Sequence, residues 1–164
     1  MALFLKNLLF TVFVPGMLAG YLPIVLVRPT GVVLAGAGLR ALPALLFLGA
    51  GMLIYFLCVW HFAVTGRGTP APIDAPKTLV VAGLYHYVRN PMYLGVLSVV
   101  TGWAILTAAP VLVLYLMALA GAFHLFVIGY EEPALRRRFG PAYEAYCRAV
   151  PRWLPARRRS DPQP

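Results

Sequence analysis

Two short groups of polar residues stand out in an apolar sequence, and their types suit the binding of a charged small molecule. The first group is Arg89, Asn90 and Tyr93, and the second is the adjacent pair Glu131 and Glu132. The pair supplies two of the five acidic residues of the chain. Paired carboxylates match a cation, and a guanidinium group offers a fork of donors to a carboxylate. We therefore expect these residues to bind a ligand that carries positive charge.

Most of these residues also have a purely structural explanation. Arg89 and the tyrosines near it flank a long apolar segment, where arginine and aromatic residues commonly anchor a helix at the membrane surface. Glu132 stands four residues before Arg136, a spacing that allows a helix-surface ion pair worth about 0.3–0.5 kcal/mol. His61 and His124 lie inside apolar segments, where we expect hydrogen-bonded core side chains rather than ligands. These explanations leave the adjacency of the two glutamates without a reason.

The composition places these residues in a membrane protein. The chain has 164 residues, of which 61% are hydrophobic and 12% charged. Soluble domains are about 45–50% apolar and about 25% charged, so the composition disfavours a soluble enzyme and excludes a disordered chain or a disulfide scaffold. The net charge of +9 is explained by basic residues around membrane spans, so we expect no nucleic-acid partner. The cysteine and histidine spacings predict no metal site.

Four apolar segments are long enough to cross a bilayer, which takes about 20 helical residues. They lie at about 8–27, 41–64, 92–107 and 110–130. The last two come from 41 residues without Lys, Arg, Asp or Glu, Asn90 to Tyr130. A straight helix of that length would measure about 60 Å, twice the hydrocarbon thickness. The stretch must fold back, and Pro110 favours a tight turn over 107–110 because proline breaks one helix and starts the next.

The predicted fold is all-α, a polytopic membrane protein with about four transmembrane helices and a cytoplasmic amphipathic C-terminal helix. We expect a single membrane domain over 1–164, with a loop at 65–91 and a tail at 131–155. With four spans, the termini, loop and tail share one side and hold twelve Lys and Arg residues, against two (Arg28 and Arg40) on the other. Because cytoplasmic loops carry the excess of basic residues, both termini are predicted to be cytoplasmic.

The hairpin brings the two polar groups together. One span begins just after Arg89 and the next ends just before Glu131, so the short turn between the spans makes these ends neighbours. The tail that follows has an apolar stripe at helical spacing, formed by Leu135, Phe139, Tyr143, Tyr146 and Val150. We expect Gly140-Pro141 to split it into two short helices that cap the hairpin, and residues 156–164 to be disordered.

These residues carry a resemblance to a known family. Arg89-Asn90-Pro91-Met92-Tyr93-Leu94-Gly95, after Gly83-Leu84-Tyr85, resembles the Arg-His-Pro-x-Tyr-x-Gly motif of the isoprenylcysteine carboxyl methyltransferases. The Glu-Glu pair, followed by Phe139-Gly140, Tyr143, Tyr146, Val150 and Arg152, is similar to the C-terminal pattern of that family. The wider group includes phospholipid methyltransferases and bacterial integral membrane methyltransferases, which implies a bacterial inner membrane. Asn90 replaces the usual His, as in phosphatidylethanolamine methyltransferases; it can hydrogen-bond but cannot titrate.

The resemblance implies S-adenosylmethionine as cofactor. Its carboxylate would suit Arg89, with Arg152 as a second choice, and its ammonium would suit the two glutamates. The candidate cofactor-binding residues are His86, Tyr87, Arg89, Asn90, Tyr93, Glu131, Glu132 and Arg152. The candidate catalytic residues are Arg89, Tyr93 and Glu132. An amine acceptor must also lose a proton, for which Glu132 or His86 is available.

The methyl acceptor is expected to be lipidic or apolar, because it enters from the bilayer, and to present a carboxylate, an amine or a thiol. Two other classes stay open at this stage. One is a non-enzymatic small membrane protein, such as an accessory subunit or a transporter. The other is a sterol-reductase-like membrane oxidoreductase, which would need a nicotinamide site.

Overall fold

The computed structural model describes residues 2–30, 38–66 and 78–155, and most of these residues are helical. Residues 156–164, for which disorder is predicted, lie outside them, as do residues 67–77 of the loop between the second and third spans. The α-helices are α1 (Ala2–Phe13), α2 (Leu22–Val27), α3 (Ala41–His61), α4 (Pro91–Thr107), α5 (Pro110–Phe126), α6 (Glu132–Phe139) and α7 (Pro141–Ala149). π-Helical turns follow α1, α3 and α5, at Gly16–Tyr21, Phe62–Gly66 and Val127–Glu131. The predicted all-α fold is confirmed.

Three long helices are apolar enough to cross a membrane, and they match three of the predicted spans. They are Leu8–Val27, Gly38–Val64 and Pro110–Phe139. The fourth span is the shorter apolar helix α4, with 17 residues. The helix that begins at Pro110 does not stop at residue 130 as predicted but continues to Phe139. The π-turn at Val127–Glu131 carries it onward, and Pro133 stands in the first turn of α6, where its missing N–H costs little.

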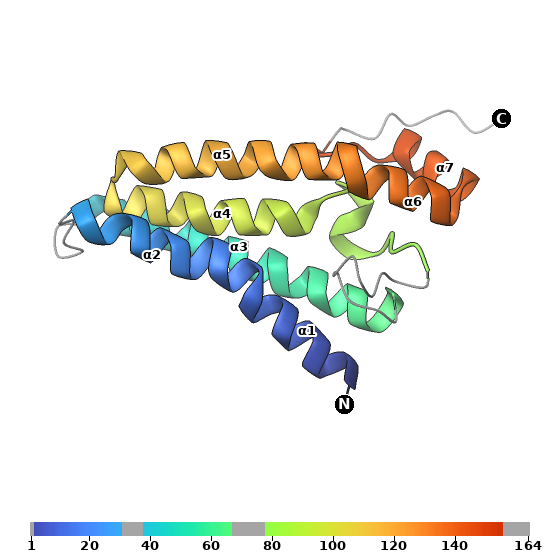
Figure 1. Cartoon of the computed structure of the whole chain (residues 1–164), viewed down its shortest axis with the longest axis horizontal. Helices are drawn as coiled ribbons and strands as arrows, with labels where there is room; N and C mark the ends of the chain where they lie inside the picture. Colours follow the sequence, from blue (N-terminus) through green and yellow to red (C-terminus); the bar gives the residue numbers. More distant parts are fainter. Residues whose placement is uncertain (1, 31–37, 67–77, 156–164) are drawn as a thin grey trace.

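The spans run along the length of the molecule (Figure 1). Helices α3, α4 and α5 pack in that order, and α2 contacts α4 and α5 while α1 diverges from them toward the N-terminus. A hydrogen bond of 2.8 Å from the Tyr115 hydroxyl to the Leu18 carbonyl joins α5 to the first span. The start of α1 and the pair α6–α7 lie toward one end of the molecule, and the turn between α4 and α5 lies at the other (Figure 1).

Glycines let α3 and α4 approach closely. A Cβ atom at Gly51 would stand 2.6 Å from the Gly95 carbonyl oxygen, and one at Gly102 would stand 2.9 Å from the Ala44 carbonyl oxygen. Small residues at such contacts replace side-chain packing with backbone packing, which holds helices together where the hydrophobic effect does not. This interface fixes the start of α4, and with it Arg89 and Tyr93.

The turn between α4 and α5 is as tight as predicted. Ala108 adopts a left-handed conformation with φ of 50°, Ala109 is extended, and Pro110 begins α5. The Thr107 hydroxyl donates to the Trp103 carbonyl at 2.8 Å and accepts the Ala109 N–H at 3.4 Å. These side-chain bonds satisfy backbone groups at a helix end that lies among apolar residues.

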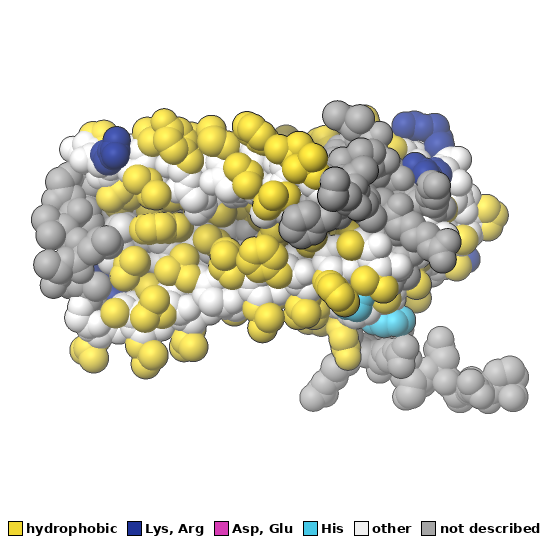
Figure 2. Space-filling model, turned by 90° about the horizontal axis from the view of Figure 1, so that it is seen from below, with side chains coloured by type: hydrophobic (Ala, Val, Ile, Leu, Met, Phe, Trp, Pro, Cys, Tyr) yellow, Lys and Arg dark blue, Asp and Glu magenta, His cyan; other side chains and the backbone are white. Residues whose placement is uncertain are grey.

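The outer surface is apolar over most of its length. Figure 2 shows hydrophobic side chains along one face, with Lys and Arg visible only near its two ends. Large side chains such as Leu114, Met117 and Trp60 are about two-thirds exposed. A soluble protein rarely exposes such continuous apolar area, whereas lipid tails solvate it. The chain is a multi-pass integral membrane protein.

The tail forms the two predicted helices. Gly140, with φ of 51°, ends α6, and Pro141 starts α7. The expected apolar stripe faces inward, since Tyr143 and Val150 are buried and its other members are partly buried. The arginines of α6, in contrast, are exposed. The tail therefore covers the open end of the α4–α5 hairpin.

Candidate active site

The open end of the hairpin, which we call the mouth, joins the two polar groups as predicted. Arg89 and Asn90 precede α4, Tyr93 lies in its first turn, and Glu131 and Glu132 lie where α5 passes into α6. Arg89 Nη1 is 3.1 Å from Glu132 Oε1, and the Tyr93 hydroxyl donates to Glu131 Oε2 at 3.0 Å. The two groups meet because α4 and α5 are equally long and are joined by a tight turn at the far end.

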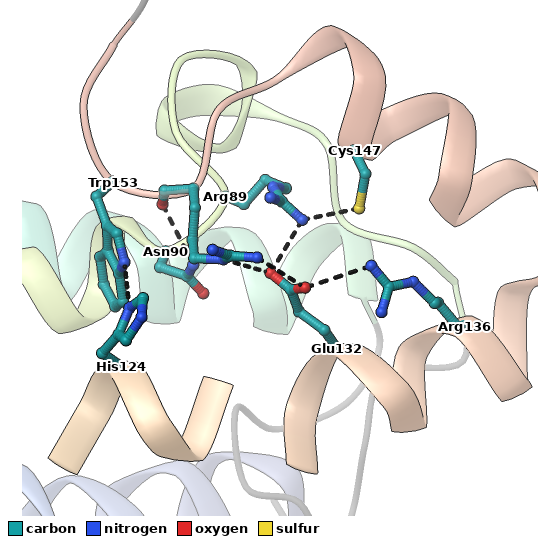
Figure 3. Close-up of polar contacts among 8 residues, drawn as sticks. Arg89, Asn90, His124, Glu132, Arg136, Cys147 and Trp153 are labelled. Carbon is teal, nitrogen blue, oxygen red and sulfur yellow. Dashed lines mark hydrogen bonds and ion pairs between the residues drawn. The ribbon is translucent and has the colours of Figure 1, made fainter. Parts of the chain in front are cut away.

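Glu132 is the centre of an ion-pair cluster (Figure 3). Its side chain is 4% exposed, and three guanidinium groups surround its carboxylate. Arg152 Nε lies 2.6 Å from Oε1 and Arg152 Nη2 lies 3.1 Å from Oε2, while Arg136 Nη2 lies 3.4 Å from Oε2. The expected pair with Arg136 is therefore present but is the longest contact. Because arginine side chains contact both carboxylate oxygens, buried Glu132 remains an anion and holds the arginines in place.

A short segment after α7, residues 150–154, closes over the mouth; we call it the C-terminal strap. The backbone N–H of Arg89 donates to the Pro151 carbonyl at 2.9 Å. The side-chain amide of Asn90 donates to the Arg152 carbonyl at 3.2 Å. The Trp153 indole N–H donates to His124 Nδ1 at 3.1 Å (Figure 3). The strap thus binds both sides of the hairpin through backbone and side-chain hydrogen bonds.

Glu131 has different surroundings from its neighbour. Its carboxylate accepts the Tyr93 hydroxyl, and among the described residues no Lys or Arg forms an ion pair with it. The Tyr93 ring packs against Phe123, with centroids 4.6 Å apart, and against Trp153, at 6.4 Å. Glu131 is therefore an acid in an aromatic environment with spare acceptor capacity, whereas Glu132 is fully engaged.

The two polar groups line one cavity of about 130 Å³. Its walls carry Arg89, Asn90, Tyr93 and both glutamates, and the remaining wall is aromatic and aliphatic, including Phe62, Tyr85, Phe126, Tyr143 and Tyr146. The Arg89 Nε–H is buried and has no hydrogen-bond partner in the described part of the chain. An unsatisfied buried donor costs about 1–3 kcal/mol, so this atom has a reason to bind an acceptor that enters the cavity.

The tyrosines on the tail side of the cavity are held as neutral donors. Burial raises the pKa of Tyr143 and of Tyr146 above the ordinary value near 10, and burial also raises that of Tyr85. The Tyr146 hydroxyl donates to the Tyr85 carbonyl at 2.8 Å, which fastens α7 to the turn before α4. The hydrogen bond to Glu132 raises the pKa of Arg152, so that side chain stays charged.

Two of the predicted site residues, His86 and Tyr87, lie away from the mouth, and a third, Arg152, contacts Glu132 there without lining the cavity. His86 and Tyr87 are exposed, and neither lines its wall. His124 is also exposed rather than part of the core, although it is hydrogen-bonded as expected. The other candidates lie at the mouth: Arg89, Asn90, Tyr93, Glu131, Glu132 and Arg152.

Sequence reasoning missed one member of the cluster. Cys147 Sγ accepts a hydrogen bond from Arg89 Nη1 at 2.8 Å (Figure 3). It stands four residues after Tyr143, so the same helical spacing that revealed the apolar stripe of the tail places it on the inward face. Tyr85 and Phe62 were also missed as cavity residues, because their positions depend on how the turn before α4 packs on α3.

Comparison with known proteins gives one match. A sequence model of the phospholipid methyltransferase family matches residues 39–142, which is more than half of the chain and includes the mouth of the hairpin up to the start of α7. The searches of curated proteins and of solved structures returned no match.

Proposed function

The chain belongs to the phospholipid methyltransferase family, and from this premise we propose that it methylates the amine headgroup of a membrane phospholipid. Members of the family are membrane methyltransferases that use S-adenosylmethionine, so the chain is an enzyme of that class. Family membership selects this class over the accessory subunit, the transporter and the sterol-reductase-like enzyme that the sequence left open. The acceptor and the residue roles below are our proposals.

The residues of the mouth fit S-adenosylmethionine, and the unpartnered Arg89 Nε is the observation that carries the assignment. The cofactor has a carboxylate that can accept this buried N–H, and an ammonium group that matches the Glu131 carboxylate on the same cavity wall. Tyrosine faces such as those of Tyr93 and Tyr143 suit its adenine and its sulfonium. When bound, the cofactor supplies an activated methyl group.

We assign Glu132, Arg152 and Asn90 to positioning. Glu132 holds Arg89 and Arg152 through its ion pairs, and Asn90 fixes the strap through the Arg152 carbonyl. A methyl transfer depends mainly on alignment of donor and acceptor, so residues that fix the cavity walls contribute to the rate without touching the reacting atoms. Tyr93 then serves as the hydroxyl that orients Glu131.

An amine headgroup fits the site better than a carboxylate or a thiol. The stretch Asn90-Pro91-Met92-Tyr93 resembles that of the phosphatidylethanolamine methyltransferases. The family also points to a lipid acceptor. The Glu131 carboxylate on the cavity wall disfavours an anionic acceptor such as a carboxylate or a thiolate, whereas an amine carries no negative charge.

We also propose that the mouth faces the cytoplasm, together with both termini. The count of basic residues supports this orientation, with twelve on the side of the termini and two on the other. Reporter fusions at the C-terminus and within residues 31–37 test it. Activity of a cytoplasm-dependent reporter at the C-terminus alone is expected, and activity at 31–37 alone would reverse the orientation.

The acceptor is tested with purified protein in lipid vesicles and radiolabelled S-adenosylmethionine. Vesicles of phosphatidylethanolamine are expected to incorporate label into the lipid fraction, and vesicles of phosphatidylcholine, whose headgroup nitrogen is already fully methylated, are not. A matched variant, Arg89→Ala, should abolish incorporation, while Arg137→Ala, which changes an exposed arginine of α6, should not. Absence of label in phosphatidylethanolamine with intact cofactor binding would overturn the amine assignment.

A further inference from the structure

A second cavity lies within the membrane-spanning part of the molecule, apart from the mouth. Its volume is about 390 Å³, three times that of the first. The first span contributes wall residues between Thr11 and Gly20, α3 contributes residues between Leu48 and Phe56, and α4 contributes residues between Gly95 and Trp103. We call this cavity the interhelical groove.

The walls of the groove offer little to a polar ligand. Apart from the indole of Trp103, its polar side chains are Thr11 and Tyr55. The Tyr55 hydroxyl donates to Thr11 Oγ1 at 2.9 Å, so these two groups satisfy one another. Buried water needs two to four polar partners, and cavities lined by apolar side chains stay dry or take apolar guests. The occupant of the groove must therefore be apolar.

The location of the groove favours one kind of apolar occupant. Gly95 and Trp103 are eight residues apart, so the groove extends about 12 Å along α4. It lies among membrane-spanning helices, and the bilayer around these helices consists of hydrocarbon chains. A hydrocarbon chain of a lipid is therefore the apolar occupant that the surroundings of the groove supply.

We propose that the interhelical groove binds one acyl chain of the lipid acceptor; this inference rests on the proposed function. Val96 on the groove wall is three residues from Tyr93 on the wall of the mouth cavity, so the two are neighbours on one face of α4, about 5 Å apart along its axis. A lipid whose headgroup nitrogen lies at the mouth therefore has the groove beside the path of its chain. The groove would thereby select acceptors with long chains and hold the headgroup at a fixed depth.

Glycine forms part of the groove wall and gives a way to close it. A Cβ atom at Gly20 would meet no atom within 4 Å, so this position has room for the start of a larger side chain. Gly121 of α5 is equally open but lies outside the groove. Gly20→Leu is thus a blocking variant and Gly121→Leu is its matched control. Met52→Trp blocks the groove from the α3 side, so the test does not depend on the folding of Gly20→Leu alone.

The experiment uses the full chain in phosphatidylethanolamine vesicles that contain a fraction of the same lipid with a photoactivatable diazirine in one acyl chain. After irradiation, labelled residues are mapped by mass spectrometry. Val96 and Val99 line the groove but are at most 9% exposed, so bulk lipid has little access to them. We expect label on these two valines in the natural chain and in Gly121→Leu, and its loss in Gly20→Leu and Met52→Trp. Unchanged or absent label at these valines would overturn the proposal.

Two parallel measurements separate this proposal from the proposed function. Binding of S-adenosylmethionine, followed by calorimetry, should be the same in the blocking variants and in the natural chain, because the groove does not line the mouth. Their KM for phosphatidylethanolamine should rise. Cofactor binding with unchanged labelling overturns the groove alone, and labelling of the valines without cofactor binding overturns the proposed function alone.

Discussion

The two ends of the α4–α5 hairpin are closed in different ways, and the difference separates structure from function. At the turn, a left-handed alanine, a proline and one threonine hydroxyl suffice, and no charged residue takes part. At the mouth, three arginines, two glutamates and a strap from the end of the chain converge. A turn alone can hold two helices together. The buried charged residues at the mouth are therefore not needed to join the two helices, and they indicate a ligand.

The largest effect is expected from neutralising the centre of the mouth. Glu132→Gln leaves Arg89 and Arg152 without their carboxylate, and an uncompensated buried charge costs about 3–5 kcal/mol. The free energy of unfolding should fall by that order, measured by thermal or denaturant unfolding in detergent. Glu144→Gln, on the exposed face of α7, is the control and should change little. Equal stability of the two variants would mean that the cluster does not hold the mouth.

The neighbouring glutamate should behave differently. Glu131→Gln keeps an acceptor for the Tyr93 hydroxyl but removes the charge proposed to bind the cofactor ammonium. A hydrogen bond to a charged group is worth about 1.5–3 kcal/mol, so the Kd for S-adenosylmethionine should rise about tenfold to a hundredfold. The unfolding temperature should stay near that of the natural chain. A large drop in stability with an unchanged Kd would mean that Glu131 has the structural role assigned here to Glu132.

A smaller loss is expected at the tyrosine between them. Tyr93→Phe removes one hydroxyl and retains the ring that packs on Phe123 and Trp153. The loss of a neutral donor corresponds to about 1 kcal/mol, or about a fivefold rise in the Kd for the cofactor. Calorimetry of this variant next to Tyr115→Phe, whose hydroxyl bonds the Leu18 carbonyl far from the mouth, isolates the effect. A Kd that moves equally in both variants contradicts the assignment.

At the turn, the smallest change is expected, and it should be a gain. Ala108→Gly relieves a positive φ and should stabilise the protein by about 1 kcal/mol or less. The same substitution at Ala104, inside α4, should destabilise it by about 0.5–1 kcal/mol. Neither variant should alter the Kd for S-adenosylmethionine. An altered Kd in Ala108→Gly would show that the turn and the mouth are coupled.

The sequence determines the hairpin and the mouth for a simple reason. An uncharged stretch too long for one span must turn, Pro110 marks where it turns, and equal arms then bring Arg89 to Glu132. Helix length and bilayer thickness are enough to predict this hairpin, and no knowledge of tertiary packing is needed. The periodic stripe of the tail is equally local, and Gly140-Pro141 divides it where the structure does.

The different surroundings of Glu131 and Glu132 at the mouth could not be predicted in the same way. Whether Glu131 or Glu132 meets the arginines depends on the rotation of α5 after its π-turn, which no local pattern reveals. The strap is a non-local feature too, since Asn90 meets Arg152 across 62 positions of sequence. His86 and Tyr87 were attractive for their side-chain chemistry, but the short helical turn at Gly83–His86 directs them outward.

The central claim is that the mouth of the hairpin binds S-adenosylmethionine through Arg89. It is tested most directly by calorimetric titration of the cofactor into purified natural chain, Arg89→Ala and Arg137→Ala in the same detergent. Saturable binding is predicted for the natural chain and for Arg137→Ala, with no detectable binding for Arg89→Ala. Absence of binding in the natural chain, or equal binding in all three proteins, would contradict the account.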